Sequence, residues 1–193
     1  MAKTSTVSPS PTPSPTPSPV STLEQGDPFE GVAATVPGIV QAEEFDTGGE
    51  GIGYSDSTVG NKKGALRPTE DVDINSMADG GYNVGYVEAG EYLRYTLDVT
   101  NKMTDIFFNF RVASANGLGS FRIVTGGTGC DDYTTDLSGL VSVPATGGNA
   151  RYENLAVSGN GTGGLRARET KIWLCIESKS FNLDYFTMLK TAV

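Results

Sequence analysis

Alternation of apolar and polar residues is the pattern that recurs along most of the chain. It is clearest in residues 83–99, NVGYVEAGEYLRYTLDV, where β-forming side chains are interleaved with polar ones. The Ala89–Gly90 pair in the middle predicts a tight turn between two strands. The stretch therefore builds a sheet and places Glu88 and Glu91 at its rim.

Further strands are predicted by alternation or by short apolar runs, at 39–45, 71–75, 105–115, 119–124, 140–143, 152–157, 171–176 and 181–188. Stretches rich in Gly, Ser, Thr and Asn, at 47–67 and 159–164, predict loops. Since no stretch has a convincing helical period, we predict an all-β fold, a β-sandwich jelly roll of two antiparallel sheets.

The N-terminal part has a different composition. Residues 8–19 read SPSPTPSPTPSP and hold six of the ten prolines. Such a segment adopts an extended polyproline conformation and buries no core. We therefore predict a disordered Pro/Ser/Thr-rich linker over 1–36 and a folded module over 37–193. The linker is interpreted as a spacer to another module. The alternative is a disordered tail without a function.

The charge balance excludes several classes of function. The 193 residues carry a net charge of −9 and include no His. An acidic chain is a poor partner for nucleic acid or anionic membranes, and for sulfated polymers unless a local basic patch overrides the balance. No apolar run is long enough to span a membrane. Without His, neither a Ser-His-Asp triad nor a His-ligated zinc site can form within this chain.

Six sequence runs occur in one order: QAEEFD (41–46), GGEGIGYSD (48–56), GGYNVGYVEAGEYLRYTLDV (80–99), FRVASANGLGSFRI (110–123), SVPATGG (142–148) and FNLDYF (181–186). Together they resemble a family 6 carbohydrate-binding module over about residues 39–189. The resemblance implies a secreted, non-catalytic module that binds a polysaccharide of the β-glucan or xylan type. It also implies a glycoside hydrolase domain in the same polypeptide, which the module directs to its substrate.

Candidate sugar-binding residues follow from the side-chain chemistry and from the resemblance. Tyr54, after two glycines, is expected to expose a flat apolar face, and Asn182 offers both a donor and an acceptor to sugar hydroxyls. The resemblance implies that a Tyr, a Trp and an Asn form a cleft at the loop end, where Asp56 would accept a hydroxyl. Asn149 replaces the Trp that usually follows PATGG, so Tyr152 or another aromatic has to substitute. The alternative for Tyr54 is a buried loop anchor.

A second candidate platform is Trp173. In residues 171–177 the apolar side chains at 172, 174 and 176 share one face, and Trp173 and Cys175 share the other. We expect Trp173 on an outer sheet face, unless the insertion at 126–139 covers it. That insertion holds Cys130, and two cysteines in an exported protein predict a disulfide between Cys130 and Cys175, with two free thiols as the alternative.

A structural calcium ion is a further expectation. Gln41 and Glu43 lie two apart on a predicted strand and so point to one face, and Asp184 lies within the last strand. The resemblance implies that these three side chains, with carbonyls from about residues 58–64, hold a structural calcium. The alternative is three solvated or hydrogen-bonded side chains.

Two other functions remain as alternatives. The first is a small glycosidase that uses Glu88 or Glu91, although one tight turn does not easily hold a sugar between two carboxylates. The second is a structural or adhesive module whose sugar site has decayed, which the missing Trp motivates.

Overall fold

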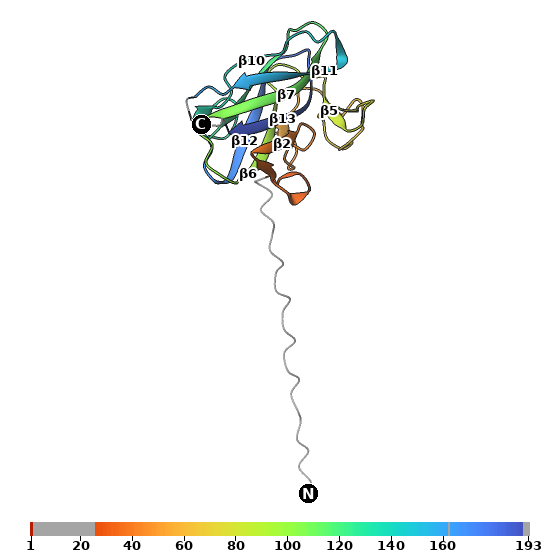
Figure 1. Cartoon of the computed structure of the whole chain (residues 1–193). Helices are drawn as coiled ribbons and strands as arrows, with labels where there is room; N and C mark the ends of the chain where they lie inside the picture. Colours follow the sequence, from red (N-terminus) through yellow and green to blue (C-terminus); the bar gives the residue numbers. More distant parts are fainter. Residues whose placement is uncertain (2–25, 162, 191–193) are drawn as a thin grey trace.

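The computed structural model describes residue 1, residues 26–161 and residues 163–190, with only the backbone at Glu169 (Figure 1). Two sheets make up the fold. The first sheet runs in the order β1 (Ala34–Val36), β6 (Tyr92–Val99), β12 (Arg168–Ser178), β8 (Ser120–Thr125), β10 (Val141–Ser142), with β3 (Tyr54–Ser55) on β6 and β9 (Thr135–Asp136) on β8. The second runs in the order β11 (Gly148–Ser158), β7 (Ile106–Ser114), β13 (Asn182–Lys190), β5 (Tyr82–Val84), β4 (Ile74–Ser76), with β2 (Gly38–Gln41) on β13.

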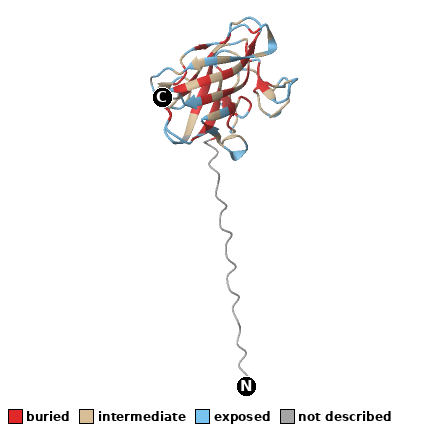
Figure 2. Cartoon of the chain, in the orientation of Figure 1, coloured by how far each residue is buried: buried red, intermediate tan, exposed pale blue. Residues whose placement is uncertain are grey.

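The core lies between the facing sides of the two sheets, where the buried residues gather (Figure 2). Aromatic side chains join the sheets: Tyr95 meets Phe186 edge to face at 5.5 Å, and Phe110 meets Phe121 at 4.8 Å. Such contacts add about 0.5–1.5 kcal/mol each beyond area burial. Among the strands of the described residues, every pairing but the parallel one of β1 with β6 is antiparallel. The predicted all-β sandwich is therefore confirmed.

The predicted boundary between residues 36 and 37 is wrong, because the folded module begins earlier. A short 3-10 helix covers Phe29–Gly31, and β1 pairs with β6 inside the first sheet, where Val36 is fully buried. Arg94 also donates a hydrogen bond to the carbonyl of Gly26 at 2.8 Å. The proline-rich segment at 8–19 lies outside the described residues. The described residues include no helix that is long and apolar enough to cross a membrane.

The two strands predicted within residues 83–99 belong to different sheets. Strand β5 pairs with β4 and β13, whereas β6 pairs with β12, β1 and β3. The segment between them makes the predicted turn, in which the Glu91 amide donates to the Glu88 carbonyl at 3.4 Å. This segment crosses from one sheet to the other, so its side chains lie at the end of the sandwich.

The insertion at 126–139 is pinned to the outer face of the first sheet. Cys130 in the insertion and Cys175 on β12 form the disulfide that two cysteines predict, with Cα atoms 5.8 Å apart. Around it, Trp173, Val124 and Tyr133 pack into a second, smaller apolar cluster, separate from the core. The insertion thus covers part of a sheet face that would otherwise be open to solvent.

Candidate functional site

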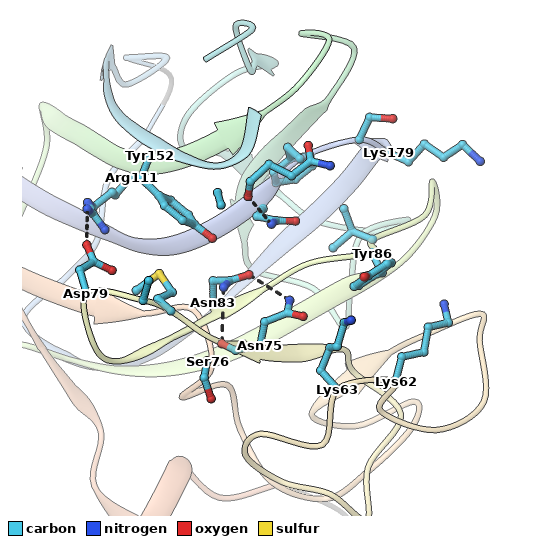
Figure 3. A pocket seen from close by; sticks show the side chains of 18 of the residues that line it. Lys62, Lys63, Asn75, Ser76, Asp79, Asn83, Tyr86, Arg111, Tyr152 and Lys179 are labelled. Carbon is cyan, nitrogen blue, oxygen red and sulfur yellow. Dashed lines mark hydrogen bonds and ion pairs between the residues drawn. The ribbon is translucent and has the colours of Figure 1, made fainter. Parts of the chain in front are cut away.

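A cavity of about 860 Å³ opens over the outward side of the second sheet and the segment after β5 (Figure 3). Its walls come from the β3–β4 loop, β4, the β4–β5 turn, β5, the β5–β6 segment, β7, β11, the β12–β13 turn and the start of β13. Charged, amide, hydroxyl and aromatic side chains line it, among them Lys62, Lys63, Asn75, Asp79, Asn83, Tyr86, Glu88, Arg111, Asn149, Tyr152, Lys179, Ser180 and Asn182.

Side-chain amides line the middle of the cavity. Asn75 donates to the Oδ1 atom of Asn83 at 3.2 Å, and Asn182 donates to the backbone carbonyl of Asn149 at 2.8 Å. Gly85 lets these amides converge, because a Cβ atom there would lie 2.6 Å from Oδ1 of Asn182 and 3.0 Å from Nδ2 of Asn75. Amides carry both donors and acceptors, which suits a ligand rich in hydroxyl groups.

Tyr86 supplies the exposed aromatic face of the cavity. Its side chain is 50% exposed, and its backbone has the left-handed φ of 54°. Ser180, with φ 82°, lines the same cavity. Left-handed backbone at residues other than Gly costs free energy and gathers at functional sites. The ring is thus held outward by a backbone conformation that a tyrosine seldom adopts.

Tyr152 and Arg111 form the opposite end of the cavity. The guanidinium lies 5.1 Å from the Tyr152 ring centroid and pairs with Asp79 at 3.1 Å and with Asp184. Burial raises the pKa of Tyr152 to about 12, while a side-chain hydrogen bond with Asn182 acts in the other direction. The phenol therefore stays protonated at neutral pH and keeps its ability to donate.

Of the predicted sugar-binding residues, Asn182, Asn149 and Tyr152 lie together in this cavity. The expectation of an exposed Tyr54 is wrong. Its side chain is 3% exposed, meets Phe45 edge to face at 5.5 Å and accepts a hydrogen bond from the Asp71 amide at 3.1 Å. Tyr54 anchors the loop that follows it, because its position in β3 turns the ring into the core, and the ring has no open face for stacking.

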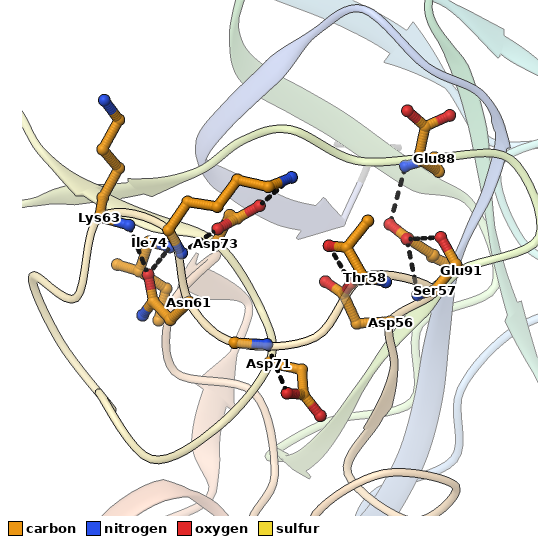
Figure 4. A network of polar contacts seen from close by, with 12 residues as sticks. Asp56, Ser57, Thr58, Asn61, Lys63, Asp71, Asp73, Ile74, Glu88 and Glu91 are labelled. Atoms are coloured by element: carbon orange, nitrogen blue, oxygen red, sulfur yellow. Dashed lines mark hydrogen bonds and ion pairs between the residues drawn. The ribbon is translucent and has the colours of Figure 1, made fainter.

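Asp56 also serves the loop instead of the cavity (Figure 4). Its Oδ1 atom accepts hydrogen bonds from the amide and hydroxyl of Thr58, both at 2.8 Å. Burial, with a smaller contribution from the nearby carboxylates of Glu91 and Asp73, raises its pKa to about 6, although the hydrogen bonds from Thr58 act in the other direction. Asp56 is not among the residues that line the main cavity, so the structure does not bring it to Asn182.

Trp173 is covered, as the alternative interpretation held. The side chain is 5% exposed and packs with the disulfide and with Tyr133 of the insertion. The expectation of an open platform on this sheet face is therefore wrong. The sequence correctly places Trp173 on the side of β12 away from the core, but it does not show how the insertion folds back over it.

The paired glutamates have structural contacts. Glu91 is 6% exposed, and its carboxylate accepts hydrogen bonds from the amide of Glu88 at 2.7 Å and from the amide and hydroxyl of Ser57 at 2.9 and 2.7 Å (Figure 4). Glu88 pairs with Lys179 at 3.1 Å. These contacts fix the turn and the neighbouring loop, and they give no support to a glycosidase that uses this pair.

Tyr86 is a cavity residue that the sequence alone did not single out. Alternation with Val84 assigns it to a strand, but β5 ends at Val84 and Tyr86 follows outside it. The available signal is Gly85, since a Gly beside the last strand residue marks a bend or a close backbone approach.

The residues predicted to hold calcium are only partly assembled. Glu43 is 6% exposed and its Oε2 atom has no hydrogen-bond partner. Burial, with smaller contributions from the carboxylates of Glu44 and Asp184, raises the pKa of Glu43 to about 7. Asp184 pairs with Arg111. Within the described ranges, no three His, Cys, Asp or Glu side chains group as metal ligands. A buried, unpartnered carboxylate oxygen is the feature that fits a hard cation.

The chain matches known proteins in sequence and in fold. The model of the family described as "Carbohydrate binding module (family 6)" matches residues 65–190. Among solved structures, CsCBM6-3 from Clostridium stercorarium, in complex with cellobiose, has a TM-score of 0.61 at 21% identity, over 83% of this chain and 99% of that one. No curated protein matches the chain.

Two further structures share the fold. The module CBM6cm-2 of Cellvibrio mixtus lichenase 5A, in complex with cellotriose, has a TM-score of 0.57 at 23% identity, over 81% of this chain and 99% of that one. A β-1,3-glucan binding CBM6 from Bacillus halodurans has a TM-score of 0.56 at 19% identity, over 82% and 99%.

Proposed function

Because the chain belongs to family 6 of the carbohydrate-binding modules, we propose that it binds a polysaccharide, without cleaving it, in the cavity around Tyr86. The observation that carries the proposal is the half-exposed Tyr86 ring beside the amides of Asn75, Asn83 and Asn182. One flat apolar face next to several fixed donors and acceptors matches the two kinds of surface that a sugar ring presents.

In this proposal, stacking on an aromatic ring and hydrogen bonds to polar side chains both contribute to binding. The apolar C–H face of a sugar stacks on Tyr86, which contributes about 1 kcal/mol or more through burial of aromatic and sugar surface. Hydroxyl groups then exchange water for the amide of Asn182 and the phenol of Tyr152, at about 0.5–1.5 kcal/mol for each hydrogen bond. Tyr152 also stands in for the aromatic wall that Asn149 does not provide.

The polymer that we propose is of the β-glucan or xylan type. The solved structures of similar fold were obtained with cellobiose or cellotriose, or bind β-1,3-glucan, as described above. We further propose that the module is secreted and attached to a glycoside hydrolase. Binding would then raise the local concentration of substrate at the catalytic domain.

A structural calcium ion held by Gln41, Glu43 and Asp184 is also proposed. The unpartnered Oε2 atom of Glu43 supports it, since a cation would neutralise a buried carboxylate that lies near a second one. The ion would supply charge neutralisation and would tie the start of the module to β13. It would take no part in sugar chemistry.

Affinity electrophoresis against soluble xylan, laminarin, lichenan and hydroxyethylcellulose tests the proposed site. Tyr86→Asn removes the ring and keeps a residue that tolerates the left-handed backbone, whereas Tyr86→Phe keeps the ring. Asn182→Ala removes the central amide. The matched control is Leu140→Ala, which truncates an exposed apolar side chain outside the cavity.

We expect at least one polymer to retard the wild type, Tyr86→Phe and Leu140→Ala. The same polymer should not retard Tyr86→Asn or Asn182→Ala. Equal retardation of Tyr86→Asn and wild type would place the site elsewhere. If no glycan in a broad panel retards the wild type, carbohydrate binding is refuted and a structural or adhesive role replaces it.

A further inference from the structure

Basic side chains gather around Tyr86. The ammonium groups of Lys62 and Lys63 lie 5.3 and 5.7 Å from the centre of its ring. Figure 3 shows them at the same end of the cavity as Lys179, while Arg111 and Asp79 lie at the other end. Two lysines thus lie beside the aromatic ring proposed to receive a sugar, and a third lines the same end of the cavity.

This local charge is opposite to that of the whole chain. The cavity is lined by four cationic side chains, at 62, 63, 111 and 179, and by two carboxylates, at 79 and 88. The chain as a whole has 14 Lys and Arg against 23 Asp and Glu. At physiological salt, charges more than about 8 Å away are largely screened. A ligand in the cavity therefore meets the lysines more strongly than the distant acidic surface.

The cations of the cavity differ in how far they are already neutralised. Arg111 pairs with Asp79 and Asp184, and Lys179 with Glu88. Lys62, with its side chain half exposed, reaches the buried Asp73 at 3.3 Å.

Lys63 forms no ion pair within the described part of the chain. Its only described side-chain contact is the face of Tyr86. Of these two lysines, only Lys62 has a carboxylate partner, so the positive charge of Lys63 remains uncompensated beside the Tyr86 ring.

We propose that the natural ligand of this cavity is an acidic polysaccharide, with a uronate carboxylate or a sulfate ester on the sugar that stacks on Tyr86. Lys63 would pair with the anionic group, and Lys62 would contribute a second donor from the same loop. This inference rests on the proposed function, because it names the class of polymer that the same site takes. The local basic patch then governs binding at the cavity, although the net charge of the chain is −9, and the composition alone does not reveal this patch.

Matched polymer pairs test the inference by isothermal titration calorimetry. One pair is glucuronoxylan and the same polymer after reduction of its carboxyl groups; the other is a sulfated galactan and its desulfated form. The protein is compared with Lys63→Gln, with the double variant Lys62→Gln/Lys63→Gln, and with Lys102→Gln, an exposed lysine of a different cavity. Thermal unfolding confirms that each variant is folded.

We expect one acidic polymer to bind about tenfold tighter than its neutral partner, equivalent to about 1.4 kcal/mol, with an affinity that falls as NaCl rises. The double variant removes this preference, Lys63→Gln weakens it, and Lys102→Gln leaves it intact. The pair in which the acidic polymer binds tighter than its neutral partner identifies the anionic group as a carboxylate or a sulfate.

Two results would overturn the inference. Equal affinity for the acidic and neutral members of both pairs, with binding still lost in Tyr86→Asn, would refute the acidic ligand and leave the proposed sugar site standing. Absence of binding to all four polymers and to the neutral panel would refute both.

Discussion

Replacing Gly85 with Ala should displace the side-chain amides that line the middle of the cavity. The added Cβ atom would lie 2.6 Å from Oδ1 of Asn182 and 3.0 Å from Nδ2 of Asn75, nearer than such atoms can approach without a shift. Overpacking of this kind costs about 1–3 kcal/mol of folding stability. Both amides therefore have to shift, which would weaken together the two hydrogen bonds that we expect them to make to a ligand, at about 0.5–1.5 kcal/mol each.

We therefore expect the affinity of Gly85→Ala for the best polymer to fall about tenfold or more, since each 1.4 kcal/mol is a factor of ten. Calorimetry measures the affinity, and urea unfolding measures the stability. Gly148→Ala is the control. A Cβ atom there has no neighbour within 4 Å, and the residue begins β11, a strand that also lines the cavity. Wild-type affinity and stability in Gly85→Ala would refute the role of this close approach.

Three further predictions concern stability. Removing the disulfide with Cys130→Ala/Cys175→Ala should cost about 4 kcal/mol in the loop-entropy model for a sequence separation of 45, seen as a lower urea midpoint; an unchanged midpoint would contradict it. Asp46→Ala leaves the buried guanidinium of Arg94 without its partner at 2.7 Å and should cost about 3–5 kcal/mol by the same assay, whereas a loss below 1 kcal/mol would show that the pair is dispensable. Calcium should raise the melting temperature of the wild type, EDTA should reverse the increase, and Glu43→Gln should abolish the response to calcium. A wild-type melting temperature that does not change with calcium would refute the proposed metal site.

The strand pattern of this fold could be predicted from sequence because each face of a strand meets a different environment. Ile172, Leu174 and Ile176 enter the core, and Trp173 does not, as period-two alternation requires. Strand β1 escaped prediction, since its pairing with β6 depends on residues more than 60 positions away. Which sheet each of β5 and β6 joins is equally a long-range property.

The site was harder to predict because exposure of an aromatic residue is decided by tertiary packing. Tyr54 and Tyr86 both follow glycine in similar local sequences, Gly-Ile-Gly-Tyr and Asn-Val-Gly-Tyr. Pairing of β3 with β6 turns Tyr54 into the core, whereas the crossing between sheets turns Tyr86 outward. Asn182 and Asn149 stand at the starts of β13 and β11, so their motifs predict their positions at one cavity, whereas their role in binding stays a prediction.

A titration of the ¹⁵N-labelled protein with an oligosaccharide of the best polymer, followed by NMR, tests the central claim most directly. Binding at the Tyr86 cavity predicts that the largest amide shifts fall in residues 83–86, 149–152 and 180–182, with little change near Trp173. Shifts concentrated at the insertion 126–139 and β12 instead would contradict the account and move the ligand to the face that the disulfide covers.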